Sequence, residues 1–153
     1  MALFGSSDKT IPGLTVDMFK EFLENTIAYM CETQKPTIKD IFKVKEGENA
    51  FFGYTFTGLT ECECEVQEDG NILTHWRGSQ SAKIKYIVNL ADFDDVMMGK
   101  MAPMTAMVTG KLKVDGPMTE AMKFINLMPP LKVAYKKARK EIGSKYGVEQ
   151  FKG

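Results

Sequence analysis

The sequence has few of the residues from which disulfide frameworks are built. It contains only three cysteines in 153 residues. An odd number of cysteines does not form a complete set of disulfides, and reduced thiols are typical of the cytoplasm. We therefore expect free cysteines and a cytoplasmic location.

The sequence also lacks an excess of charge of either sign and lacks long apolar runs. Lys+Arg and Asp+Glu number 20 each, so the formal net charge is zero. A nucleic-acid-binding protein usually carries a basic surface, so we expect no nucleic-acid partner. No apolar run is long enough to cross a bilayer, and the N-terminus does not have the pattern of a secretory signal. The C-terminal residues do not form a peroxisomal address.

Methionine, by contrast, is concentrated in one part of the chain. Eight of the eleven methionines lie between Met97 and Met128. A methionine side chain is flexible and polarizable, so a wall made of methionines can adapt to apolar surfaces of different shapes. A single methionine is most simply a core residue, but eight in one stretch favour a deformable apolar pocket.

The length predicts one domain with a sizeable core. We expect a flexible arm at residues 1–14, the domain at 15–146 and a tail at 147–153. Thr15 is a predicted N-cap for a helix over 16–31, and Pro36 should interrupt the helical pattern. Residues 37–45 then favour a short helix, with a strand as the alternative.

The apolar period then changes from helical to alternating. In the segment TECECEVQ, Cys62, Cys64 and Val66 alternate with three glutamates that we expect to face solvent. The turn around Asp69 and Gly70 predicts a hairpin. Strands are predicted over 52–56, 61–66, 72–77, 82–90 and 111–115.

Helical patterns return after residue 91. Asp92 should cap a short helix that ends at Gly99, and a second short helix should cover 103–108. A helix is expected from Pro117 until Pro129 and Pro130 break it, and a last helix over about 131–142. This order predicts an α+β fold, with a single mostly antiparallel five-stranded sheet and helices packed on one face. The helices have more apolar side chains than one sheet face can bury, which indicates an internal cavity.

The segment MVTGKLKVDGPM, from Met107 to Met118, resembles the sterol carrier protein type 2 domain family. The Asp92-Phe93 and Gly99-Lys100 pairs before it fit the same pattern, and the resemblance is specific from about residue 83 to 128. It implies a five-stranded sheet covered by helices that enclose a hydrophobic tunnel. It also implies binding of sterols, fatty acids, acyl-CoA or phospholipids without catalysis.

The first hypothesis is therefore a non-catalytic lipid carrier, with no metal or cofactor. Its ligand would be a lipid or fatty-acyl molecule held between the sheet and the methionine-bearing helices. The alternative is an accessory domain that presents a lipid or isoprenoid substrate to a partner enzyme. The predicted wall consists of Phe56, Trp76, Phe93, Met97, Met101, Met104, Met107, Met118, Met122 and Ile125.

The last predicted helix is basic. Its lysines Lys136, Lys137 and Lys140 suggest transient contact with an anionic membrane surface. The simpler interpretation is a solvated helix face whose apolar side packs on the domain. The sequence does not predict an oligomeric state.

A remote alternative is a small metal or redox protein. Cys62 and Cys64 point the same way from one strand, and His75 lies on the predicted partner strand. Two thiolates and an imidazole can bind zinc. No fourth ligand is evident, however, and buried cysteines are common as small hydrophobic residues.

Overall fold

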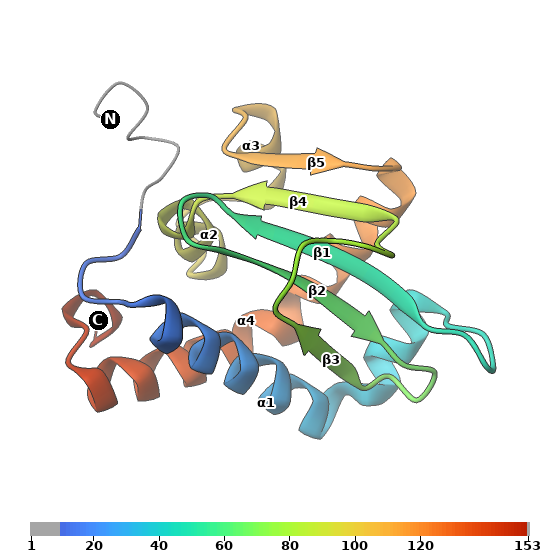
Figure 1. Cartoon of the computed structure of the whole chain (residues 1–153), viewed down its shortest axis with the longest axis horizontal. Helices are drawn as coiled ribbons and strands as arrows, with labels where there is room; N and C mark the ends of the chain where they lie inside the picture. Colours follow the sequence, from blue (N-terminus) through green and yellow to red (C-terminus); the bar gives the residue numbers. More distant parts are fainter. Residues whose placement is uncertain (1–9, 153) are drawn as a thin grey trace.

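The computed structural model describes residues 10–152 and shows an α+β domain (Figure 1). The predicted fold class is confirmed. In chain order the elements are α1 (Val16–Phe42), β1 (Ala50–Phe56), β2 (Thr60–Val66), β3 (Ile72–His75), β4 (Ile84–Val88), α2 (Leu90–Met97), α3 (Pro103–Val108), β5 (Leu112–Asp115), α4 (Met118–Tyr146) and the 3₁₀ helix η2 (Glu149–Lys152).

Helix α1 begins where the sequence predicts but ends later. The Thr15 side chain caps it by accepting a hydrogen bond from the Met18 backbone N–H at 3.2 Å. The predicted break at Pro36 is wrong, because one helix of 27 residues continues through this proline. Pro36 cannot donate a hydrogen bond to the carbonyl of Glu32, but Glu32 is exposed and water can satisfy that carbonyl.

The five strands form one sheet in the order β3-β2-β1-β4-β5. Three of the neighbouring pairs are antiparallel, and β1 pairs with β4 in parallel. Parallel neighbours need a connection that crosses the sheet. Here the chain leaves β3 at one edge and passes over β2 and β1 to reach β4.

One face of the sheet is apolar and faces the helices. Phe52 and Tyr54 of β1 stand opposite Cys64 and Cys62 of β2, and Tyr86 of β4 lies beside Tyr54. Helices α1 and α4 pack against each other below this face, as Figure 1 shows. The alternation predicted from the sequence therefore places the core correctly.

The opposite face is covered by the β3–β4 connection, which Glu63 holds in place. The Oε2 atom of Glu63 accepts hydrogen bonds from the backbone N–H groups of Gln80, Ser81 and Ala82, at 2.9, 2.7 and 2.9 Å. Arg77 donates to the Oε1 atom through Nε and an NH2 group, at 3.0 and 2.8 Å. The prediction that this glutamate faces solvent is wrong, because its side chain is fully buried.

The same connection touches β1 at Gly53. A β-carbon at this position would lie 1.7 Å from the Ser79 Oγ atom and 3.0 Å from the Ser79 β-carbon, so a larger residue would require Ser79 to move. The glycine in the aromatic strand is thus explained by the close approach of a second segment.

Two predictions about the later helices also need correction. The N-cap of α2 is Asn89, not Asp92: the Asp92 N–H donates to the Asn89 Oδ1 atom at 2.8 Å. Helix α4 is not broken, and its 29 residues include Pro129 and Pro130. Pro130 leaves the carbonyl of Asn126 without its helical donor, and Asn126 is exposed.

The ends of the described chain pack on the domain. Ile11 and Leu14 belong to the predicted arm, and Val148 and Phe151 belong to the predicted tail, yet all four are buried. A β-carbon on Gly143 of α4 would lie 2.7 Å from the Phe151 β-carbon. Residues 1–9 of the arm and residue 153 of the tail lie outside the described residues.

The Glu63 contacts make a testable contribution to stability. Glu63→Gln replaces one acceptor oxygen by an NH2 group, which leaves either Arg77 or the three backbone donors without a proper partner. We expect urea denaturation to show a loss of about 3 kcal/mol in the free energy of unfolding. Glu61→Gln, the same change at an exposed position of the same strand, should cost about 0.5 kcal/mol or less.

This contribution should also depend on pH. Burial alone raises the pKa of Glu63, but the hydrogen bonds from Ser81, Arg77, Gln80 and Ala82 outweigh burial and lower the pKa below its ordinary 4.5. The stabilisation is therefore present above pH 4.5 and is lost as the pH falls towards the lowered folded-state pKa. Equal acid sensitivity of the wild type and Glu63→Gln would contradict this account.

Candidate functional site: an apolar cavity between sheet and helices

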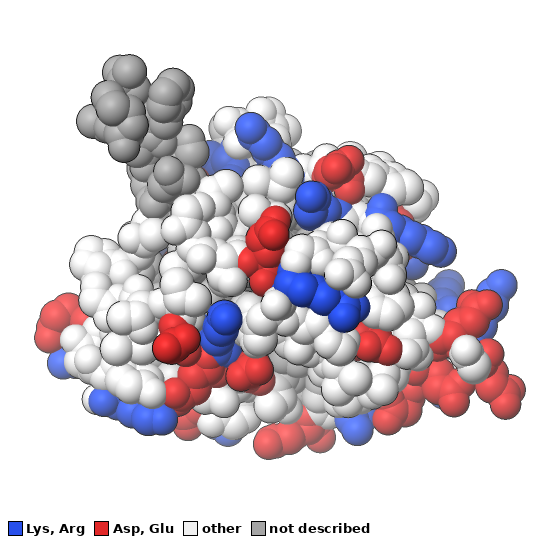
Figure 2. All heavy atoms as spheres, viewed as in Figure 1, with Lys and Arg blue, Asp and Glu red and all other residues white. Residues whose placement is uncertain are grey.

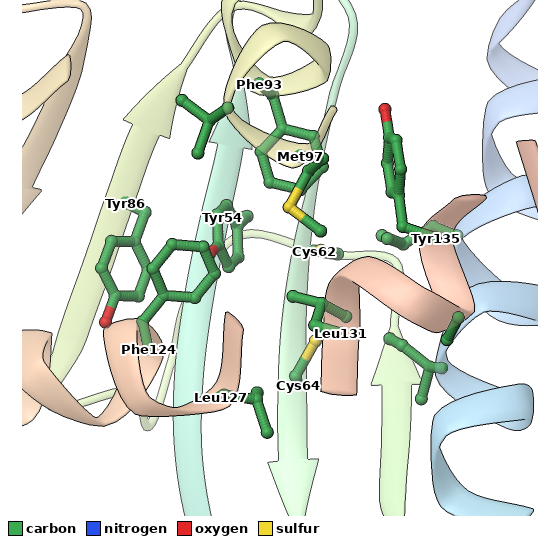
Figure 3. Close-up of a cluster of buried hydrophobic side chains, with 14 of the residues drawn as sticks. Tyr54, Cys62, Cys64, Tyr86, Phe93, Met97, Phe124, Leu127, Leu131 and Tyr135 are labelled. Atoms are coloured by element: carbon green, nitrogen blue, oxygen red, sulfur yellow. The ribbon is translucent and has the colours of Figure 1, made fainter. Parts of the chain in front are cut away.

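A narrow cavity of about 30 Å³ lies between the apolar sheet face and helices α1, α2 and α4. Figure 3 shows many of its wall residues converging from the sheet and α4. The wall consists of Leu23, Thr26, Ile27 and Met30 of α1, Phe52, Tyr54 and Phe56 of β1, Cys62 and Cys64 of β2, Ile72 of β3, Phe93 of α2, and Phe124, Leu127, Leu131 and Tyr135 of α4.

The cavity wall is uncharged. None of the described residues that line it is Lys, Arg, His, Asp or Glu. Its polar atoms are mostly engaged, since Thr26 donates to the Phe22 carbonyl at 2.9 Å and Tyr135 donates to the Asp94 Oδ1 atom at 2.5 Å. A hydrogen bond with Cys62, together with burial, raises the pKa of the Cys64 thiol, so this thiol stays protonated. The site therefore offers mainly apolar contact.

Aromatic rings form one side of the cavity. Tyr54 stacks on Tyr86 at 4.8 Å between ring centroids and on Phe56 at 5.5 Å. Phe93 and Phe124 meet the Tyr54 ring edge-on, at 5.8 and 5.6 Å. This cluster holds the Tyr54 ring rigidly at the centre of the sheet face.

Of the predicted wall residues, Phe56 and Phe93 line this cavity. Met97 is fully buried and appears next to Phe93 in Figure 3, but it is not part of the cavity wall. Trp76 lies at the domain surface, where its indole N–H donates to Glu24 at 3.1 Å and Lys20 lies 5.4 Å from its ring.

The other predicted wall residues lie outside this cavity. Met104, Met118 and Met122 are 50%, 57% and 41% exposed. Met118 and Met122 are exposed because α4 is rotated so that its buried side, with Ala121, Phe124 and Leu127, faces the sheet. The remaining three residues, Met101, Met107 and Ile125, are partly buried.

The sequence interpretation missed the contribution of α1 to the wall. Leu23, Ile27 and Met30 recur at helical spacing in the helix predicted over 16–31, but this helix was not assigned to the cavity. The signal was present in the helical spacing. What was missing was the pairing of α1 with α4, which only the tertiary structure shows.

A buried ion pair supports the α4 side of the cavity. Arg139 donates from Nε to the Asp94 Oδ1 atom at 2.9 Å and from NH2 to the Oδ2 atom at 3.0 Å. Arg139 also donates to the Gln150 carbonyl at 2.9 Å. Asp94 and Arg139 are both buried, although Arg139 lies in the helix that the sequence predicts to be basic. Because Tyr135 also donates to Asp94, this network fixes one wall residue of the cavity.

A surface groove of about 250 Å³ runs between α1 and the edge strand β3. Ile27 and Ile72 line both this groove and the internal cavity. These two side chains therefore separate the cavity from the surface.

The residues proposed for a metal site do not come together. Cys62 and Cys64 face the core, whereas His75 pairs with Glu63 in the sheet register and points to the opposite face, where it lies 2.8 Å from Glu65. Within residues 10–152, no group of three His, Cys, Asp or Glu side chains is arranged to hold a metal ion.

The chain belongs to the SCP-2 sterol transfer family, whose model matches residues 42–129, more than half of the sequence. This result confirms the resemblance found in the sequence. No curated protein sequence matches the chain.

Solved structures agree on the fold. A sterol carrier protein domain from Helicoverpa armigera has 21% identity and a TM-score of 0.53, over 82% of this chain and 95% of that one. A structure described as UbiJ-SCP2, a ubiquinone synthesis protein, has 16% identity and a TM-score of 0.53, over 74% and 86%. The chain spans only 13% of a sec-alkylsulfatase from Pseudomonas sp., with 17% identity and a TM-score of 0.45.

The buried ion pair leads to a prediction about stability. Arg139→Met leaves the Asp94 carboxylate buried without its cation, so we expect a loss of about 4 kcal/mol in the free energy of unfolding. Asp94→Asn combined with Arg139→Met removes both charges and keeps an acceptor for Tyr135. Denaturation of the double variant should show a smaller loss than the single Arg139→Met variant. A larger loss would contradict the ion-pair assignment, and exposed Lys140→Met serves as the control.

Proposed function

We propose that the protein binds and carries a lipid in the interior between the sheet and helices α1 and α4, without catalysis. The observation that carries this proposal is the uncharged cavity in a chain of the SCP-2 sterol transfer family. A wall without charged groups favours the alkyl part of a fatty acid, acyl-CoA, phospholipid or sterol-like molecule. The free and buried cysteines support the cytoplasm as its location.

Lipid binding must widen the cavity. Pockets that hold small molecules usually measure about 300–1,000 Å³, whereas this cavity measures about 30 Å³. Each methylene that leaves water contributes roughly 0.8 kcal/mol, so a sixteen-carbon chain gains about 12 kcal/mol before the costs of binding. Part of this gain is available to separate α1 and α4 from the sheet. The groove beside β3 supports a route in which Ile27 and Ile72 move aside.

The lipid site can be tested at Cys62, which lines the cavity and is fully buried. Cys62→Leu fills space inside the cavity, whereas Cys62→Ala enlarges it. In titrations with a fluorescent sixteen-carbon fatty acid, we expect Cys62→Leu to weaken binding about tenfold, a change of about 1.4 kcal/mol. Cys62→Ala should bind as tightly as the wild type or more tightly.

Stability measurements must accompany this test, because overpacking costs about 1–3 kcal/mol. Circular dichroism should show that Cys62→Leu remains folded at the temperature of the titration. Equal affinity in all three proteins would place the lipid outside this cavity. Absence of saturable binding by the wild type, together with no co-purified lipid in native mass spectrometry, would refute lipid carriage.

We also propose transient contact of α4 with anionic membranes. Lys136, Lys137 and Lys140 are exposed, and Lys137 additionally lies 4.0 Å from the Tyr29 ring. Within residues 10–152, no helix is long and apolar enough to cross a membrane. On the surface drawn in Figure 2, basic and acidic side chains are interspersed, so any attraction must come from a local cluster.

Vesicle co-sedimentation tests this contact. Lys136→Glu with Lys140→Glu should lower the fraction bound to vesicles of phosphatidylglycerol and phosphatidylcholine at low salt, because each basic residue contributes about 1 kcal/mol near such a surface. Lys137 stays unchanged because of its contact with Tyr29. Lys100→Glu with Lys111→Glu makes the same charge change at other exposed positions and should bind like the wild type. Equal loss in both variants would point to non-specific attraction.

A second candidate function is an accessory domain that presents a lipid or isoprenoid substrate to a partner enzyme. The exposed apolar side chains Met104, Val108 and Met118 favour it, because they are available for contact with another protein. A stable partner in pull-down experiments, combined with little lipid transfer between vesicles, would distinguish this function from carriage.

A further inference from the structure

The Tyr54 hydroxyl is the unusual group in the cavity wall. Tyr54 is only 6% exposed, and its hydroxyl oxygen is a buried polar atom with no hydrogen-bond partner. A buried hydroxyl without a partner costs free energy, so most such groups in native proteins are bonded. The other two hydroxyl-bearing wall residues differ, since Thr26 donates to Phe22 and Tyr135 donates to Asp94.

The surroundings keep the hydroxyl in place. Ring contacts with Tyr86, Phe93 and Phe124 hold Tyr54 on several sides, so the hydroxyl cannot easily turn towards water. Figure 3 shows Tyr54 projecting from β1 towards Phe124 of α4. A donor is therefore held in an apolar cavity without an acceptor from the described protein.

We propose that the Tyr54 hydroxyl donates a hydrogen bond to an uncharged acceptor oxygen of the bound lipid, such as that of a ketone, ester or ether. This inference rests on the proposed lipid site and specifies the chemical class that the site prefers. The preferred ligand is an apolar molecule with a neutral oxygen inside its buried part.

The acceptor is neutral in this proposal because the described residues of the cavity wall carry no charge. A carboxylate or phosphate next to Tyr54 would be buried without a cation, because no described residue of the wall is basic. A neutral oxygen has a much smaller desolvation cost, and one hydrogen bond can offset it. Fatty acids can still bind, but with the carboxylate at the surface and the alkyl chain inside.

The protonation state of Tyr54 fits a donor. Burial, with smaller effects from Tyr86 and the two cysteines, raises the pKa of this phenol well above its ordinary value of 10.0. The hydroxyl therefore keeps its proton throughout the pH range in which the protein is studied. It can donate to a ligand but does not supply an anion.

The test compares 2-tetradecanone with 1-tetradecene, which share a long alkyl chain but differ in the acceptor oxygen. Both are delivered from cyclodextrin and measured by displacement of a fluorescent fatty acid. The wild type should bind the ketone about five- to tenfold more tightly than the alkene, as expected for one hydrogen bond. Tyr54→Phe should remove this preference by weakening ketone binding and leaving alkene binding unchanged.

Tyr86→Phe is the matched control. Tyr86 is also buried and stacks on Tyr54, but it does not line this cavity, and its hydroxyl lies 3.5 Å from the Glu120 carbonyl. This variant should keep the preference for the ketone. A purely structural role of Tyr54 predicts that Tyr54→Phe lowers stability. We expect instead that loss of the unpartnered hydroxyl raises the melting temperature of the lipid-free protein by about 3 °C.

The outcomes separate the two proposals. If the wild type binds both probes equally, or if Tyr54→Phe keeps the preference for the ketone, the role of Tyr54 is refuted while lipid carriage stands. If the wild type binds neither probe nor the fluorescent fatty acid, lipid carriage itself fails.

Discussion

The fold depends on how Glu63 fixes the connection between β3 and β4. Strand β4 lies parallel to β1, and β2 and β1 separate it from β3. The chain must therefore cross two strands to reach β4 from β3. The carboxylate of Glu63 holds three consecutive backbone N–H groups of this crossing segment, and Arg77 balances its charge. The polar interaction on one face of the sheet thus sets the position of β4, and with it the aromatic floor of the cavity on the other face.

The two faces of the sheet therefore make different kinds of contact. One face is held by charged and polar contacts with the connection, while the other carries the aromatic cluster around Tyr54. The helices add a second layer, in which Asp94 and Arg139 fix Tyr135 beside the cavity. Charged side chains thus lie around the cavity, whereas none of those in the described part of the chain lines its wall. A charged group in the wall would bind water and would oppose the replacement of that water by an alkyl chain.

The fold was largely predictable because its signals are local. The alternation around Cys62 and Cys64, the turn at Gly70 and the cap at Thr15 each depend on neighbouring residues. The failures concern long-range contacts. Pro36 and Pro129 seemed to end helices, but helices α1 and α4 pack on each other and on the sheet, and this packing outweighs the loss of single hydrogen bonds.

The candidate site was predictable in kind but less so in detail. Apolar periodicity indicated an interior between sheet and helices, and two of the predicted wall residues, Phe56 and Phe93, line the cavity there. It did not determine which side of α4 faces the sheet, so Met118 and Met122 were assigned inward. It also gave no sign that Glu63 differs from Glu61, because both occupy the same face of the strand, and only the path of a distant segment buries one of them.

The packing of Phe151 has a practical consequence for the limits of the domain. Its ring lies 5.1 Å from that of Phe22 and 4.7 Å from the Arg139 guanidinium, and η2 covers this end of the ion pair. Truncation after Tyr146 would uncover an aromatic patch and expose a salt bridge that is now buried. Shortened versions for crystallography, and fusion partners attached at this end, should therefore retain the sequence through Lys152.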